Sequence, residues 1–243
     1  MKVLGIVPAR GGSKGIHRKN LQLLNGKPLI AYTAEAAFGA RRLTRVVLST
    51  DDQQIADVGQ SWGLEVPFLR PAELAADDTP TLPVIQHVLA RLEAAGDRFD
   101  AVCILQPTAP FRRPEFIDGC IQALEDSEAD SVVTVLPVPD AHNPHWVYFK
   151  GSDGCLRLST GEPAPIPRRQ DLPPAFHREG SVYVTRRNVV MDQNSIFGAR
   201  LIGFPVDPRD SIDINSPEDL ARAEMLLRDR GAAQARLNHA YRL

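Results

Sequence analysis

The sequence predicts an α/β protein with a mostly parallel, doubly wound (Rossmann-like) sheet covered by helices on both faces. Two observations predict it: short apolar runs alternate with longer helical patterns up to residue 136, and a similar alternation resumes after residue 180. A proline-rich stretch between them predicts an excursion from this core. With 243 residues, 43% of them hydrophobic and 24% charged, the chain can bury such a core without disulfides or a structural metal.

The predicted elements alternate along the chain. We interpret as strands residues 3–7, 46–48, 65–69, 101–105, 131–136, 181–184 and 201–206. Helical patterns occupy residues 29–38, 53–62, 82–94 and 115–124. Ligands of such sheets bind beyond the carboxyl ends of the strands, so the loops after Val7, Leu48 and Leu105 should share one rim.

The last helix is marked at its start by Ser216 as N-cap, with Pro217 in the first turn and Asp219 placed to complete a capping box. Gly231 is its predicted end, since glycine commonly follows the last helical turn. Residues 232–243 are predicted to form a loosely held tail.

Residues 137–174 hold eight of the 20 prolines of the chain. Proline removes a backbone donor and stops helices, so this stretch cannot continue the wound sheet. Because the strand and helix pattern resumes at Ser181, the predicted organisation is a core of residues 1–138 and 181–231 with an inserted arm at 139–180. An irregular surface loop is the alternative, although loops of this length without a role are uncommon.

Composition excludes several classes of protein. A net charge of −2, from 28 basic and 30 acidic residues, argues against a nucleic-acid binder. Cys103, Cys120 and Cys155 form no CxxC pair, which leaves neither a disulfide framework nor a zinc cluster. The N-terminal apolar run is too short for a signal peptide, and no apolar stretch is long enough for a membrane span. We expect a cytoplasmic protein with neither nucleic acid nor membrane as a partner.

The loop after the first strand, residues 8–20, combines three glycines with four cations within ten residues: Arg10, Lys14, Arg18 and Lys19. Glycines let backbone N–H groups approach an anion, and a triphosphate needs such donors together with fixed positive charge. The loop contains neither the P-loop pattern nor the dinucleotide GxGxxG pattern. A solvated basic loop is the alternative, and the position after a strand favours an anion site.

Three other segments carry weaker signals. In DSIDIN, period-two alternation puts Asp213 and Asn215 on one face, where two oxygens suit magnesium, although a turn before the last helix explains Asp213 equally well. Gln106 can donate and accept near a ligand, or simply belong to a polar turn. Arg168 and Arg169, in the arm, suit a carboxylate ligand, and an exposed charged loop is the alternative.

Together these segments resemble the acylneuraminate cytidylyltransferases, the CMP-sialic acid synthetase family. The match is ordered and runs through IVPARGGSKGIHRKNLQLLNGKPLIAYT, VVLSTDD, LRPAELAADDTPT, LQPTAPFR, RRQDLPPAF, GSVYV and DSIDINSPEDL. The resemblance implies a sheet of nucleotidyltransferase type and transfer of CMP from CTP to the anomeric 2-hydroxyl of a nonulosonic (sialic-acid-like) 2-keto sugar acid. It implies Mg²⁺ as cofactor, and a homodimer whose arm is a dimerisation element reaching the partner's site.

The resemblance also implies residue roles. The implied catalytic residues are Arg10, Lys14 and Asp213. The other implied nucleotide contacts are Gly11, Ser13, Lys19, Asn20 and Thr81. The implied sugar-acid contacts are Gln106, Arg169, Trp146 and His177. Asp213 and Asn215 are the implied metal ligands.

Three positions depart from the family pattern. Many relatives have a second aspartate where Asn215 stands. Sialic-acid-specific members often carry lysine at the place of Trp146 and arginine at that of His177. Legionaminic, pseudaminic and deaminated nonulosonic acids therefore remain open beside N-acetylneuraminic acid.

Two alternatives stay open. One is a nucleotidyltransferase for a different sugar, such as an eight-carbon 2-keto acid, whose enzymes usually have aspartate where Gln106 stands. The other is a catalytically inactive nucleotide-binding relative. Asn215 gives that alternative some support, and the presence of Arg10, Lys14 and Asp213 together argues against it.

Overall fold

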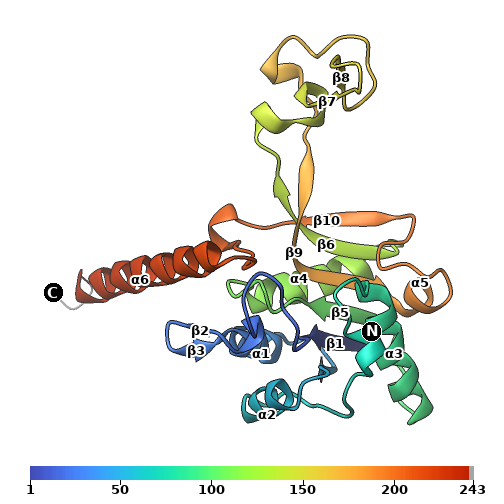
Figure 1. Cartoon of the computed structure of the whole chain (residues 1–243), viewed down its shortest axis with the longest axis vertical. Helices are drawn as coiled ribbons and strands as arrows, with labels where there is room; N and C mark the ends of the chain where they lie inside the picture. The colour runs from blue at the N-terminus through green and yellow to red at the C-terminus, as the bar shows by residue number, and fades with distance from the viewer. Residues whose placement is uncertain (241–243) are drawn as a thin grey trace.

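The computed structural model describes residues 1–240, and the side chains of residues 1–230. Its centre is a six-stranded sheet in the order β10-β6-β9-β5-β1-β4 (Figure 1). The strands are β1 (Val3–Pro8), β4 (Arg45–Ser49), β5 (Ala101–Leu105), β6 (Ser131–Pro137), β9 (Phe176–Arg186) and β10 (Leu201–Pro205). β1 is parallel to β4 and β5, and β10 to β6, whereas β9 is antiparallel to both neighbours. The predicted mostly parallel sheet is confirmed.

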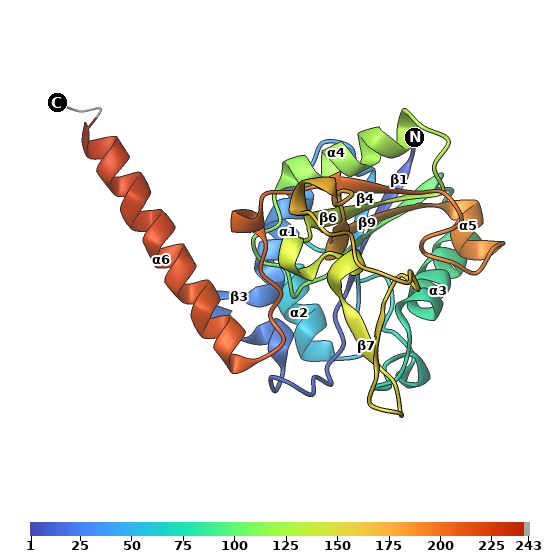
Figure 2. The ribbon, with the colours of Figure 1, turned by 90° about the horizontal axis from the view of Figure 1, so that it is seen from above.

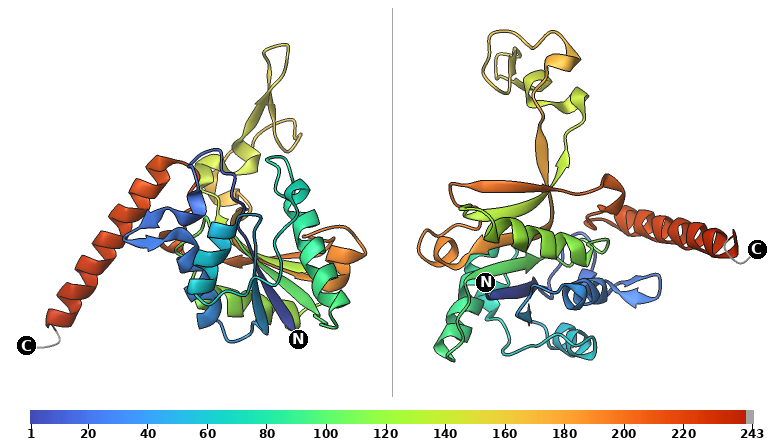
Figure 3. Two further views of the ribbon diagram at one scale, coloured as in Figure 1. Left: turned by 60° about the horizontal axis from the view of Figure 1, so that its bottom comes forward. Right: turned by 180° about the vertical axis from the view of Figure 1, so that it is seen from behind.

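Helices cover both faces of this sheet (Figure 3). One face packs against α1 (Leu29–Gly39), α2 (Gln53–Ser61) and α4 (Pro114–Glu125), and the other against α3 (Thr81–Ala94) and α5 (Arg187–Met191). Val3 and Val7 of β1 join the first core, and Leu4 and Ile6 join the second. Successive strand side chains point to opposite faces, so a continuous apolar run is what a strand buried on both sides requires.

β9 is longer than the predicted strand at 181–184 and contains a bulge. Val133 of β6 pairs with Tyr183, and Val135 pairs with Arg178, so residues 179–182 lie opposite Thr134 alone. Gly180 has a φ of 90°, a conformation that glycine adopts without steric cost. Bulges re-aim side chains, and residues of this one line a cavity described below.

The arm leaves the sheet after β6 and returns at the start of β9, projecting far from the core (Figure 1). It carries the two-stranded hairpin of β7 (Tyr148–Lys150) and β8 (Leu156–Leu158). Residues 176–178 of the predicted arm instead pair with β6, because the sheet pairing of β9 begins at Phe176. The predicted excursion is present, and it is shorter at its C-terminal end than expected.

Two local predictions are wrong. Residues 65–69 form no strand, since only Glu65 bridges to Val47. α6 (Pro217–Ala240) continues through Gly231, so residues 232–240 of the predicted tail are helical, and 241–243 lie outside the described residues (Figure 2). Flanking alanine, glutamine, arginine and leucine are good helix formers, and one internal glycine costs only about 1 kcal/mol.

The capping box that starts α6 is confirmed. The Asp219 N–H donates to Ser216 Oγ at 3.2 Å, and the Ser216 N–H donates to Asp219 Oδ2 at 2.9 Å.

A short hairpin of β2 (Leu23–Leu24) and β3 (Lys27–Pro28) precedes α1. Within the described part of the chain, no helix has the length and apolarity to cross a bilayer.

Candidate active site

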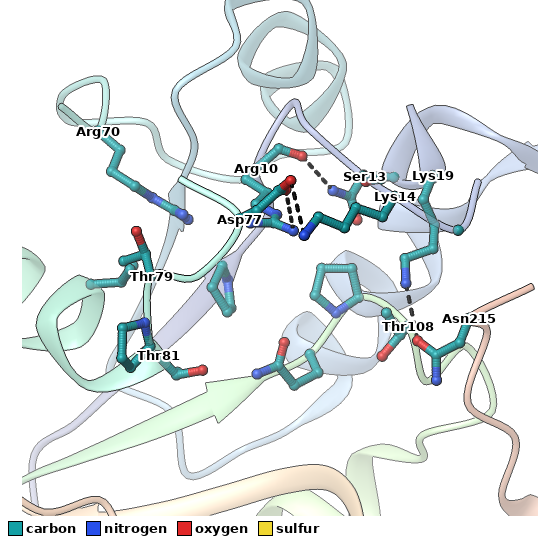
Figure 4. A pocket seen from close by; sticks show the side chains of 17 residues that line it. Arg10, Ser13, Lys14, Lys19, Arg70, Asp77, Thr79, Thr81, Thr108 and Asn215 are labelled. Carbon is teal, nitrogen blue, oxygen red and sulfur yellow. Dashed lines mark hydrogen bonds and ion pairs between the residues drawn. The ribbon is translucent and has the colours of Figure 1, made fainter. Parts of the chain in front are cut away.

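A cavity of about 410 Å³ opens at the carboxyl ends of β1 and β5 (Figure 4). It is lined by the loop after β1, the segment that leads into α3, the loop after β5, and Asn215. The loop after β4 supports it from outside, because Asp51 Oδ1 accepts the Gly11 N–H at 3.0 Å and Asp52 Oδ2 accepts Arg18 Nη2 at 2.7 Å. The three predicted loops therefore share one rim.

The loop after β1, which we call the phosphate loop (residues 8–20), is held close to the segment that precedes α6. A Cβ on Gly15 would lie 2.0 Å from the Asn215 carbonyl oxygen, so only glycine permits this approach. Ile16 packs in a small core with Ile212 and Ile214. Asn20, predicted to contact the nucleotide, lines the cavity while its side chain donates to the Arg10 carbonyl at 3.0 Å.

Three cations of the phosphate loop line the cavity: Arg10, Lys14 and Lys19. Lys19 Nζ donates to the Ile214 carbonyl at 2.8 Å and to Asn215 Oδ1 at 3.2 Å. Burial lowers the pKa of Lys19, and the charge of Asp213 opposes that shift. Ser13 and Thr81 also line the cavity, whereas Gly11 does not and instead anchors the loop through its N–H.

Asp213 and Asn215 lie as the alternation predicted. Both are exposed, while Ile212 and Ile214, which alternate with them, are buried. The Ile214 N–H donates to the Thr108 carbonyl at 2.8 Å, which fixes this segment beside the loop after β5. Asn215 lines the first cavity, and Asp213 lines a second one beside it.

These residues fit a magnesium site with one carboxylate. Asn215 Nδ2 donates to Asp213 Oδ2 at 2.6 Å, while Asn215 Oδ1 accepts from Lys19. Among the described residues no group of three or more His, Cys, Asp and Glu side chains is placed to hold a metal. Magnesium usually takes one or two carboxylates and completes its shell with waters and substrate phosphates, so a site with Asp213 as its one carboxylate is compatible with the ion. Asn215 supports Asp213 in this arrangement.

The second cavity, of about 490 Å³, adjoins the first and shares Gln106 and Thr108 with it. Its other walls come from the β9 bulge and from the segment before α6, and they include His177, Arg178, Glu179, Tyr183 and Asp213. Glu179 ties the two walls together, because its carboxylate accepts from Ser181 N at 3.0 Å and from Ser211 Oγ at 3.0 Å. Gln106 thus stands between the two cavities.

Arg112, which sequence reasoning missed, fixes the position of Gln106. Its guanidinium is buried and donates to the Ser181 carbonyl at 2.8 Å, to Thr33 Oγ1 at 3.1 Å and to the Gln106 carbonyl. Burial lowers its pKa to about 10. A buried charge is costly unless it is hydrogen-bonded, and the bonds that Arg112 donates also connect three separate segments of the chain. The only sequence signal is its place in PFRR after the central strand.

Arg70 was missed as well. It lines the first cavity, and burial lowers its pKa to about 10. Its guanidinium donates to the Ser49 carbonyl at 2.6 Å and to Ser49 Oγ at 3.1 Å. Asp77 is a third missed residue, since it lines the same cavity and pairs with Arg10 and Lys14 at 3.0 and 3.2 Å.

Two predicted sugar-acid contacts lie away from both cavities. Trp146 and Arg169 belong to the arm, where Trp146 Nε1 donates to the Ile166 carbonyl at 2.7 Å and Arg169 pairs with Asp140. Neither side chain lines the cavities of its own chain. His177, at the base of the arm, does line the second cavity.

A Rossmann-like sheet with a cationic loop after β1 and paired cavities on its carboxyl rim is the arrangement expected of a nucleotide-binding enzyme such as a nucleotidyltransferase. Comparisons with known proteins agree. A family model described as cytidylyltransferase matches residues 4–200. The CMP-N,N'-diacetyllegionaminic acid synthase of Legionella pneumophila is 34% identical over 93% of this chain and 97% of its own length. The N-acylneuraminate cytidylyltransferase of Escherichia coli is 28% identical over 91% of this chain and 51% of its own length.

Among solved structures, a CMP:2-keto-3-deoxy-manno-octonic acid synthetase complexed with CTP aligns with a TM-score of 0.72 over 95% of this chain and 100% of the other, at 19% identity. That likeness shows the shared fold. The chain belongs to the cytidylyltransferase family, and it is a nucleotidyltransferase of the CMP-acylneuraminate synthase type. The sequence resemblance is thereby confirmed.

Proposed function

We propose that this protein transfers CMP from CTP to the anomeric 2-hydroxyl of a nonulosonic acid and releases pyrophosphate. The observation that carries the proposal is the pair of adjoining cavities that share Gln106 and Thr108. One cavity concentrates the cations Arg10, Lys14 and Lys19, as a triphosphate requires. The other is walled by polar groups suited to a hydroxylated acid. The relatives of this protein include a CMP-N,N'-diacetyllegionaminic acid synthase and an N-acylneuraminate cytidylyltransferase, which supports the same substrate class.

In this reaction the 2-hydroxyl oxygen forms a bond to the α-phosphorus while the bond from that phosphorus to the pyrophosphate oxygen breaks in line. Pyrophosphate leaves, and the hydroxyl proton is released to solvent. Catalysis of such transfers is mainly positioning and charge stabilisation. Arg10 and Lys14 would neutralise the phosphates, and Gln106 would orient the acid between the cavities. Magnesium held by Asp213 and the phosphates would supply further charge neutralisation when bound.

We expect the protein to release pyrophosphate from CTP far faster than from ATP or GTP. A coupled pyrophosphate assay across a panel of acceptors tests this, with the panel containing nine-carbon acids of neuraminic, legionaminic, pseudaminic and deaminated types. An eight-carbon 2-keto acid and a hexose 1-phosphate test the alternatives. Equal turnover with a purine triphosphate contradicts the proposal, and no turnover with any acceptor identifies an inactive nucleotide-binding relative.

The arm provides the support for a homodimer, which is part of this proposal. Its hairpin exposes apolar side chains that the described part of its own chain leaves uncovered: Tyr148 at 43%, Phe149 at 67% and Leu156 at 63%. A projecting apolar hairpin is stabilised by burial against a partner. A second copy would cover it, and Trp146 and Arg169 would then reach the partner's acceptor cavity.

The protein should therefore be a dimer by light scattering, and Phe149→Asp should shift it toward monomer and lower activity. Phe38→Asp is the matched control, because Phe38 is 52% exposed on α1 of the core. Its mass should stay that of the dimer. A fully active monomer at working concentration would refute the role of the arm.

A further inference from the structure

Asp77 lines the first cavity beside Arg10 and Lys14 (Figure 4). Its Oδ1 lies 3.0 Å from Arg10 Nη2, and its Oδ2 lies 3.2 Å from Lys14 Nζ. Arg10 Nη1 also donates to the neighbouring Ala76 carbonyl at 2.7 Å. The two carboxylate oxygens are therefore each used by a different cation, and both cations belong to the phosphate loop.

A triphosphate and this carboxylate compete for the same donors. Carboxylate and phosphate oxygens are both preferred partners of arginine and lysine cations. A bound triphosphate would also place negative charge against Asp77, and like charges at close range repel. Asp77 is about half exposed and Lys14 more so, at 49% and 74% of their side chains. Exposed ion pairs are weak, so the contact can be displaced.

We propose that Asp77 is an internal counter-ion, a positioning residue that holds Arg10 and Lys14 before nucleotide binds and competes with the triphosphate for them. This inference rests on the proposed function only in naming the triphosphate as the ligand. When CTP binds, its phosphates replace the Asp77 carboxylate at both cations. After the transfer, the Asp77 carboxylate competes with pyrophosphate for the same two cations, and this competition favours dissociation of pyrophosphate.

The test is direct binding to Asp77→Asn, with CTP, inorganic pyrophosphate and cytidine as separate probes in calorimetry, with and without magnesium. Removal of the competing charge should tighten CTP and pyrophosphate binding about threefold to tenfold, as expected for the loss of two exposed pairs. Cytidine has no phosphate, so its affinity should not change. The gain should shrink as salt is raised. Asp77→Glu, which keeps the charge, should restore weaker binding.

Asp78→Asn is the matched control, because it removes the same charge one residue away and the described residues give Asp78 no ion pair. It should leave pyrophosphate affinity near that of the wild type. Unchanged or weaker pyrophosphate binding to Asp77→Asn would overturn the proposal, as would an equal gain in Asp78→Asn. No acceptor acid is present in these measurements, so failure of the proposed transfer reaction would appear separately, in the acceptor panel.

Discussion

Replacing Lys14 with alanine is expected to lower turnover by about two orders of magnitude or more, because a cation that stabilises charge in the transition state is lost. The protein should still fold, since the Lys14 side chain is 74% exposed and its one ion pair in the described structure is with Asp77. Steady-state pyrophosphate release gives kcat and KM for CTP, and thermal melting reports the fold.

Lys2→Ala is the control for that experiment. Lys2 is an exposed lysine just before β1, at the amino end of the strands and opposite the cavities. Its removal should change neither turnover nor melting temperature. Full activity in Lys14→Ala would contradict this role and would favour the alternative that the phosphate loop is a solvated basic surface.

Asp213→Asn is expected to lower turnover about a hundredfold or more, because it removes the one carboxylate proposed to hold magnesium. It also places an amide against the amide of Asn215, where the structure has a 2.6 Å hydrogen bond from Asn215 to a carboxylate. Activity should require magnesium and disappear with a chelator. Undiminished activity in Asp213→Asn would overturn the metal assignment.

Asn215→Asp should act in the opposite direction and lower the magnesium concentration needed for half-maximal rate. Two carboxylates would then stand where Asn215 now donates to Asp213, and their repulsion is relieved by a cation. The melting temperature of this variant should also rise more with magnesium than that of the wild type. An unchanged half-maximal concentration would leave Asn215 with a purely structural role, as the partner of Lys19 and Asp213.

Several features of the site could be predicted from the sequence because they depend on local rules. Period-two alternation correctly placed Asp213 and Asn215 outward and the isoleucines Ile212 and Ile214 inward. The rule that ligands bind at the carboxyl ends of parallel strands brought the phosphate loop and Gln106 to one rim. The proline-rich stretch correctly marked an excursion from the sheet, because proline cannot continue a helix or a central strand.

Contacts between side chains distant in sequence become visible in the folded structure alone. Arg112 bonds to residues 69 and 79 positions away, and no local pattern encodes partners so far along the chain. No sequence signal pointed to Asp77, which the fold places between Arg10 and Lys14. Trp146 and Arg169 were correctly assigned to the arm, yet the arm carries them away from their own chain's cavities. Periodicity reports which face a residue takes, whereas strand order and the path of an insertion arise from contacts between segments distant in sequence.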